Sequence, residues 1–445
     1  MYIEDMQILD SKKWITSDVI AGGCGGDVME GHKITLQFLQ DLVSQTEHDV
    51  TILSFKVTEA VGRGDNYTSI LYRVMASGTK MTDGGPSEWQ RSLIYKRLPD
   101  SPSHRELYRS DVLFQNEVSF YKEAFASLIE FQSSTETEEP FSAVPKCFMA
   151  EQDVIVLEDL KERGFVMGNR KAGLDFQHCV AVFREIARFH ALSLAMKCQD
   201  PVKFQEQVAS SVQETFFTEQ NEEYYRDYYS TVTQNALAMV NCGLEDSEKL
   251  TYLKKFEDFL DEKTFFKTMM KQVEPVEPIA VLVHGDFWTN NIMFRYSESG
   301  EIEEVCFVDF QCVRYGSPAL DLVNFLYACT SPGLRATHLQ SLLSEYCSAL
   351  SYSLAAMGCD TGSQPYCLSD NVPAIIQKEL QIHSHFGLGL ALDMIPISTC
   401  DSTLAPDLYQ TEADQGTVTP FSQYNPECQR RMTELVRDLV DRGYL

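Results

Sequence analysis

The chain has 445 residues, of which 44% are hydrophobic and 23% are charged, so it is long enough to bury a sizeable core and disorder of the whole chain is excluded. Lysine and arginine number 37 against 65 aspartates and glutamates, which gives a net charge of −28. This balance argues against a nucleic-acid binder and against a protein that docks on anionic membrane. A phosphate site in this chain therefore needs local cations or a metal ion.

The 13 cysteines are scattered and include no C-x-x-C pair. The first residues, MYIEDMQILDSKKW, lack the apolar segment of a signal peptide, and no apolar run reaches the length of about 18 residues that a membrane span needs. We therefore expect free thiols and a cytoplasmic location.

The first part of the chain predicts a small antiparallel sheet. Residues 79–90 (TKMTDGGPSEWQ) are polar and predict a turn-rich loop, and the acidic residues 133–140 predict another loop. A helix is expected over residues 110–129. Strands are expected at residues 52–61, 70–76, 91–98 and 154–160.

Helical patterns dominate from residue 175 onward, with a break near residues 242–243 and a closing helix that places Met432 and Val436 on one face. Short strands are expected at residues 279–284 and 304–310, and a loop at 400–427. The order predicts an α+β fold with a β-rich N-lobe (residues 1–157), a mostly helical C-lobe (residues 158–445) and a cleft between them.

The most informative segment is VLVHGDFWTNNIMF (residues 281–294). A strand ends there at a turn that presents Asp286, Asn291 follows five residues later, and a second strand ends at Asp309. Two carboxylates and an amide are hard oxygen ligands of the kind that Mg²⁺ prefers. Phosphoryl transfer needs such charge neutralisation, so Asp286 is predicted to accept the hydroxyl proton, and Asn291 and Asp309 to bind metal. The alternative is a hairpin turn with incidental acids.

Parts of a nucleotide site are also expected in the N-lobe. Lys96 lies late in a predicted strand and is a candidate for contacting phosphates, although a surface lysine is the alternative. Glu117, on the next helix, is a candidate partner for Lys96. The turn at residues 62–69, with Gly62, Gly64, Asn66 and Ser69, is a candidate cover for phosphates, although most such turns are plain hairpins. The strand before Leu160, with Glu158, is a candidate adenine-binding connector or an ordinary strand.

Three further residues are predicted to support the site structurally. His190 lies on the apolar face of its helix, His284 precedes the turn, and Asp321 caps a helix or braces the turn. Arg314 is expected either to contact phosphate or to form a structural ion pair. The aromatic segment at residues 222–229 is packed helix or, in a small-molecule kinase, part of an acceptor pocket.

The motifs GDNYTS, LEDL, ARFHALS, HGDFWTNN and VDFQCVRYGSPALDL resemble the ecdysteroid kinase-like family, which is related to aminoglycoside phosphotransferases and choline kinases. The resemblance implies a protein-kinase-like fold and transfer of the ATP γ-phosphate, with Mg²⁺, to a small-molecule hydroxyl. It also implies an ion pair between Lys96 and Glu117 and a hinge at residues 157–160.

The acceptor that the resemblance implies is an ecdysteroid-like steroid alcohol. The alternatives are a detoxifying kinase of dietary phenols, glycosides or alkaloids, and a pseudokinase that binds nucleotide or hormone without turnover. No nucleic-acid or membrane partner is expected. The sequence leaves open whether the protein is a monomer or a homodimer, and what the segments at 133–140 and 400–427 do.

Overall fold

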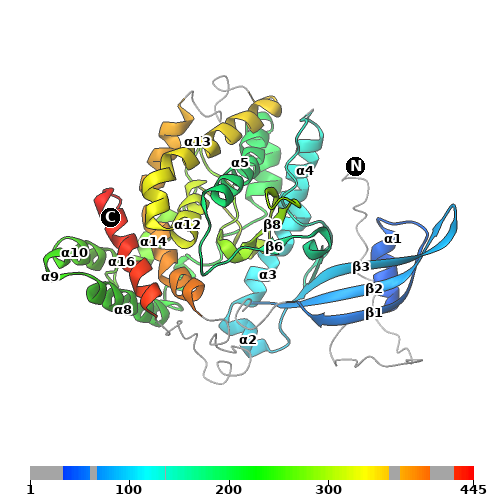
Figure 1. Ribbon diagram of the computed structural model, residues 1–445, viewed down its shortest axis with the longest axis horizontal. Coiled ribbons are helices and arrows are strands. Elements are labelled where there is room, and N and C mark those ends of the chain that lie inside the picture. Colours follow the sequence, from blue (N-terminus) through cyan, green and yellow to red (C-terminus); the bar gives the residue numbers. More distant parts are fainter. Residues whose placement is uncertain (1–33, 61–67, 136, 360–370, 401–424) are drawn as a thin grey trace. The chain divides into compact units, whose positions relative to one another are not determined.

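The computed structural model describes residues 34–60, 68–135, 137–359, 371–400 and 425–445. Within these residues the chain forms two compact units (Figure 1). The first unit contains residues 34–60, 71–97 and 146–159, and the second contains the other described residues. Gly62, Gly64 and Asn66, and most of the loop expected at 400–427, lie outside the described residues.

The first unit is an antiparallel sheet with the strand order β1-β2-β3-β5-β4 and one helix, α1 (Leu36–Ser44), against β1. Helix α1 begins where the Thr35 hydroxyl accepts the N–H of Phe38, and it buries Leu39, Leu42 and Val43. The strands are β1 (Val50–Glu59), β2 (Ile70–Thr82), β3 (Gly85–Arg97), β4 (Cys147–Glu151) and β5 (Val154–Glu158).

The prediction of a loop over residues 79–90 is wrong, because β2 continues to Thr82 and β3 begins at Gly85. These strand ends are largely exposed, so polar residues occupy both faces and the apolar alternation of a half-buried strand is missing. Strand β4 was likewise not expected, since its partly exposed edge position requires no strong apolar pattern.

The second unit is mostly helical. The helix expected at 110–129 is present but continues to Ser133 through a π-helical turn, η2. The helices and helical turns are α2 (Pro102–Leu107), α3 (Ser110–Ser119), η2 (Phe120–Ala124), α4 (Phe125–Ser133), η3 (Leu160–Arg163), α5 (Phe176–Gln199), α6 (Pro201–Phe204), η4 (Gln205–Ala209), α7 (Glu219–Glu222), α8 (Arg226–Gly243), α9 (Asp246–Lys249), α10 (Tyr252–Phe259), α11 (Phe265–Gln272), η5 (Thr289–Asn291), η6 (Phe310–Cys312), α12 (Ala319–Cys329), α13 (Pro332–Ala356), α14 (Val372–Thr399) and α16 (Pro426–Asp441).

Long helices form the core of the second unit. Helix α5 packs against α13, and α12 packs against α14 (Figure 1). Asp175 caps helix α5, because its carboxylate accepts the N–H of His178, and the apolar residues of α5 recur at helical spacing, as the sequence predicts. The predicted break near residue 243 is the end of α8.

Short strands lie between these helices. Strand β7 (Val281–Val283) pairs with β10 (Arg314–Gly316), and β8 (Ile292–Tyr296) pairs with β9 (Ile302–Phe307) and with β6 (Val166–Met167). Strands β7 and β9 correspond to the two expected strands, both shorter than predicted at their C-terminal ends. None of the described helices is both long and apolar enough to cross a membrane.

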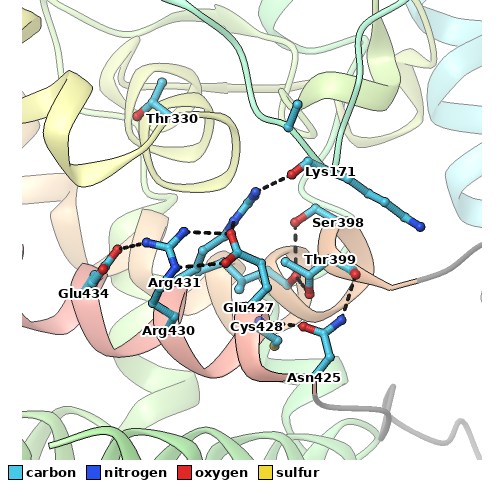
Figure 2. Close-up of polar contacts among 12 residues, drawn as sticks. Lys171, Thr330, Ser398, Thr399, Asn425, Glu427, Cys428, Arg430, Arg431 and Glu434 are labelled. Atoms are coloured by element: carbon cyan, nitrogen blue, oxygen red, sulfur yellow. Dashed lines mark hydrogen bonds and ion pairs between the residues drawn. The ribbon is translucent and has the colours of Figure 1, made fainter.

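The closing helix α16 is fastened by polar contacts at its N-terminal end (Figure 2). Asn425 caps it by accepting the N–H of Cys428 at 2.8 Å and donates to the carbonyl of Thr399 at 2.9 Å. Glu427 accepts hydrogen bonds from Arg430 and Arg431. The bond from Arg430 is the main reason that the pKa of Glu427 is lowered to about 2.

Candidate active site

The turn that carries Asp286 follows directly on the buried strand β7. Its central residue, Gly285, has a φ of +85°, a conformation that L-residues with side chains rarely adopt. A Cβ atom at Gly285 would also lie 1.9 Å from the carbonyl oxygen of Cys312. Glycine is therefore required at this position on both grounds.

A buried carboxylate holds the turn in place. Asp321, in the first turn of α12, accepts the N–H of His284 at 2.8 Å and the N–H of Gly285 at 2.9 Å. His190 lies 3.2 Å from the same carboxylate, and its other ring nitrogen contacts the hydroxyl of Tyr346 at 2.9 Å. Burial alone raises the pKa of Asp321, but the hydrogen bond and charge of His190 and the other donors outweigh it and lower that pKa below its usual value.

His284 connects the turn to the end of the second strand. Its Nε2 lies 3.0 Å from the carbonyl oxygen of Val308, and its Nδ1 accepts the N–H of Asp286 at 3.3 Å. Burial lowers the pKa of His284, so the imidazole is neutral, donates from Nε2 and accepts at Nδ1. The ring thereby joins the segment before Asp286 to the segment before Asp309.

The β8–β9 hairpin brings Asn291 and Asp309 together. Ile292, at the start of β8, pairs with Phe307, at the end of β9, so the residues just outside this pair are neighbours. The N–H of Val308 donates to the carbonyl of Asn291 at 3.0 Å. Asp309 follows directly, with a φ of +68° that turns the chain into η6. Two residues that lie 18 positions apart are thus held at one end of one hairpin.

Asn291 is bonded to Asp286. Its side-chain amide donates to the backbone carbonyl of Asp286 at 2.8 Å and to the carboxylate Oδ2 at 2.8 Å. Because the nitrogen of the amide makes both of these bonds, the amide oxygen Oδ1 lies on the side of the amide group away from Asp286. Asp286 also receives a hydrogen bond from the side chain of Trp288, whose indole N–H is only a donor.

Burial raises the pKa of Asp286 to about 7, and the neighbouring carboxylate of Asp309 adds to the rise. The hydrogen bonds from Asn291 and Trp288 and the charge of Arg314 act in the opposite direction without cancelling it. Asp286 and Asp309 each keep part of their surface exposed, so both remain reachable. A carboxylate with this pKa can take up a proton at neutral pH.

The donor set fits a magnesium ion. Asn291 Oδ1 and the Asp309 carboxylate are hard oxygen donors beside a second carboxylate. Among the residues that the structure describes, no cluster of three or more His, Cys, Asp or Glu side chains forms a metal site. Magnesium commonly binds through one or two protein ligands and completes its shell with water and phosphate, so the smaller set suits this ion.

Helix α3 is tied to the segment after Asp309. Asn116 donates to the carbonyls of Gln311 and Val313 at 3.1 and 2.8 Å, and its oxygen accepts the N–H of Gln213. The next residue, Glu117, is buried. At the described end of the candidate phosphate turn, Ser69 is buried and Thr68 donates to Gln311 at 2.6 Å.

In the first unit, Lys96 lies on β3 opposite Ile155 and is only 4% exposed, so it is not a surface lysine. Glu158 ends β5 and accepts the N–H of Lys146 at 2.9 Å. Asp159 accepts hydrogen bonds from Ser92 and Arg73. Leu160 belongs to the second unit, where it packs with Phe165 and Cys306.

Sequence reasoning missed Trp288 and Glu214. Trp288 lies inside the HGDFWTNN motif, so its position was a usable signal. Glu214 carries no such signal, since it lies in a loop 72 residues before Asp286 and becomes relevant only through its ion pair with Arg314. Of the two interpretations of Arg314, the ion pair is the one observed.

The small antiparallel sheet and the mostly helical unit make up an α+β, two-lobed fold, as the sequence predicts. The model of the ecdysteroid kinase-like family matches residues 63–359, well over half of the chain. The chain therefore belongs to the ecdysteroid kinase-like family, and its class is that of small-molecule kinases. No curated protein matches the chain.

Several solved structures are similar to the chain at low sequence identity. An ethanolamine kinase of Plasmodium vivax has 12% identity and a TM-score of 0.38, with 92% of this chain and 88% of that chain covered. The streptomycin–ATP complex of APH(2″)-IIa has 11% identity and a TM-score of 0.31, with 85% and 98% covered. A choline/ethanolamine kinase family protein of Mesorhizobium loti has 9% identity and a TM-score of 0.32, with 86% and 92% covered.

Proposed function

We propose that the protein transfers the γ-phosphate of ATP, with magnesium, to a hydroxyl group of a small molecule. The observation that carries this proposal is the amide of Asn291, which donates to Asp286 while the β8–β9 hairpin holds Asp309 beside it. The arrangement combines a candidate base with two candidate metal ligands. Family membership supports the kinase chemistry.

Asp286 is the proposed base. As the acceptor oxygen bonds to the γ-phosphorus, its proton passes to the Asp286 carboxylate, and the bond between that phosphorus and the bridging oxygen breaks, with its electron pair leaving on ADP. The raised pKa of Asp286 suits this proton transfer near neutral pH. Asn291 orients the carboxylate, and its Oδ1, with Asp309, would hold magnesium, which supplies charge neutralisation to the phosphate oxygens when bound.

The remaining assignments are also proposals. Lys96 is proposed to contact ATP phosphates with Glu117 as its partner, and the segment at 157–160 to bind adenine. An ecdysteroid-like alcohol is the proposed acceptor, because the family's description points to this class. A cytoplasmic location is proposed because described cysteines such as Cys179, Cys312 and Cys329 are thiols rather than halves of a disulfide.

Most aromatic residues of the segment at 222–229 are packed inside the protein and do not support an acceptor pocket. Tyr225 stacks on Phe216 with ring centroids 5.3 Å apart, and Tyr229 packs edge-on and tilted against neighbouring rings, so both belong to the packed core. Tyr228 donates to Asp393 at 2.8 Å and is partly exposed. Packed helix is therefore the better description for most of this segment.

The test is ADP release with a panel of ecdysteroids, phenols, glycosides and alkaloids. We expect acceptor-dependent ADP release that falls about 10²-fold or more in Asp286→Asn, with ATP binding retained. Lys96→Ala is expected to weaken ATP binding, and an unchanged ATP titration would remove Lys96 from the site. Acceptor-dependent turnover that survives in Asp286→Asn contradicts the proposed base, and ligand binding without turnover in the wild type indicates a pseudokinase.

A further inference from the structure

An ion pair between a buried arginine and a largely buried glutamate lies next to the 284–286 turn and has no role in the proposed chemistry. Arg314 is on β10, opposite Val283 of β7, the last strand residue before the turn. Its Nε lies 2.7 Å from Oε2 of Glu214. Arg314 is only 3% exposed. An arginine is expensive to bury and is normally given a full set of hydrogen bonds.

This pair has unused hydrogen-bonding capacity. Among the described residues, Nε and Nη1 of Arg314 and Oε2 of Glu214 are buried and have no hydrogen-bond partner, because the short ion-pair contact is not aligned with the N–H direction. A donor and an acceptor are therefore left side by side, both shielded from bulk water. Such groups in a native protein indicate a ligand or a bound water.

Both side chains are held rigidly. The other oxygen of Glu214, Oε1, accepts the N–H groups of Phe216 and Phe217 at 2.7 and 2.8 Å. The guanidinium of Arg314 lies over the ring of Phe386, 5.5 Å from its centroid. The pair is thus pre-oriented, which reduces the entropy cost of binding a ligand.

The pair belongs to the surroundings of Asp286. The charges of Asp286, Arg314, Asp309 and Glu214 all act on the buried thiol of Cys312, whose pKa burial raises well above its usual value. The four charged groups therefore lie close enough to one cysteine for their charges to act on it.

We propose that Arg314 and Glu214 form a hydroxyl-binding pair that holds a second hydroxyl of the acceptor while the first faces Asp286. This inference rests on the proposed function. A hydroxyl oxygen can accept from Arg314 and donate its proton to Glu214, so one group satisfies both. A carboxylate or phosphate would be repelled by Glu214, and an ammonium by Arg314. The pair is neutral overall and selects a neutral acceptor with at least two hydroxyls.

The test combines enzyme variants with acceptor variants. The probes are a polyhydroxylated ecdysteroid, a set of analogues that each lack one hydroxyl, and the pair catechol and phenol. Binding is measured by calorimetry without ATP, and turnover by ADP release. In the wild type, loss of one particular hydroxyl is expected to weaken binding about 10-fold or more. In Glu214→Gln and Arg314→Lys the same loss is expected to have almost no effect.

Glu214→Gln is the sharper variant, because glutamine keeps an oxygen for the N–H groups of Phe216 and Phe217 and replaces only the acceptor that faces Arg314. The matched control is the exposed pair of Arg184 and Glu345, where Arg184→Lys and Glu345→Gln should leave discrimination unchanged. Circular dichroism and thermal melting verify that each variant folds. Unfolding of Arg314→Lys leaves Glu214→Gln to decide the matter.

The inference is overturned if folded Glu214→Gln discriminates between the analogues as the wild type does, if choline or ethanolamine binds better than the neutral probes, or if a protein that binds ATP binds none of them. If the wild type depends on one hydroxyl for binding and this dependence is lost in Glu214→Gln, but no ADP is released, the hydroxyl-binding pair is supported and the proposed function is contradicted. ADP release that depends on Asp286 but not on Arg314 or Glu214 supports the proposed function and contradicts the hydroxyl-binding pair.

Discussion

The 284–286 turn brings together two carboxylates, Asp321 and Asp286, whose environments have opposite effects on the pKa. Asp321, behind the turn, accepts two backbone N–H groups and faces His190, so its pKa is lowered despite complete burial. Asp286, on the turn itself, is half-buried and lies near the charge of Asp309, and these two effects raise its pKa to about 7. The first carboxylate stabilises the turn in its charged form, whereas the second keeps a proton affinity that is useful for catalysis and costly for stability.

The largest expected effect comes from changing the carboxylate behind the turn. Asp321→Asn leaves one acceptor oxygen for two N–H groups and removes the charge that faces His190. We expect a loss of about 4 kcal/mol in the free energy of unfolding, typical of a broken buried pair. Thermal melting is expected to show a fall of about 8 °C, and ADP release should fall with it. Wild-type melting together with wild-type turnover would show that Asp321 does not hold the turn.

The next effect concerns the backbone between the two carboxylates. Gly285→Ala combines an unfavourable φ with a Cβ atom placed 1.9 Å from the carbonyl oxygen of Cys312. We expect a loss of about 3 kcal/mol. Gly300→Ala is the matched control, since Gly300 has a φ of +86° and no atom within 4 Å of an added Cβ. Its cost should be about 1 kcal/mol, and equal melting temperatures for the two variants would rule out the steric argument.

Asp286→Asn tests the sign of the second pKa shift in protein freed of metal by EDTA. A carboxyl whose pKa is raised on folding, from 3.8 to about 7, reduces stability progressively as pH rises through this interval and by a constant amount above it. The neutral asparagine avoids the cost. We expect the variant to gain about 2 kcal/mol more over the wild type at pH 8 than at pH 5. A gain that is independent of pH would contradict the raised pKa.

The smallest effect is expected at an exposed carboxylate with a low pKa. The Arg430 hydrogen bond lowers the pKa of Glu427 to about 2, so its contribution is present at neutral pH and disappears as pH falls toward 2. Because Glu427 is exposed, water screens the pair, and Glu427→Gln should cost less than about 1 kcal/mol. Chemical denaturation at pH 7 measures this loss in the free energy of unfolding. A larger loss would show that the contacts of Figure 2 stabilise the protein more than expected.

Much of this arrangement could be predicted from the sequence. The helical spacing of residues 176–194 and the strand before His284 are strong local patterns, and the motif around Asp286 and Asn291 places both residues on one short turn. The fold class follows from the order of these elements and is confirmed. The strand ends at 79–90 escaped prediction because exposed strands carry no apolar alternation.

Other features depend on long-range contacts that no local pattern contains. The two bonds from His284 and Gly285 to Asp321 join segments 36 or 37 residues apart, and Glu214 meets Arg314 across 100 residues of sequence. Pairing of this kind follows from the packing of whole elements. The sequence could therefore name Asp321 and Arg314 as candidates without assigning their partners.

The most direct test of the central claim is calorimetric titration of ATP with and without magnesium. If Asn291 and Asp309 bind the metal beside Asp286, the wild type takes up ATP much more tightly with magnesium, and Asp309→Asn reduces this magnesium-dependent gain about 10-fold or more while the melting temperature stays close to that of the wild type. ATP binding that is the same with magnesium and with EDTA, or a full magnesium gain in Asp309→Asn, would contradict the account.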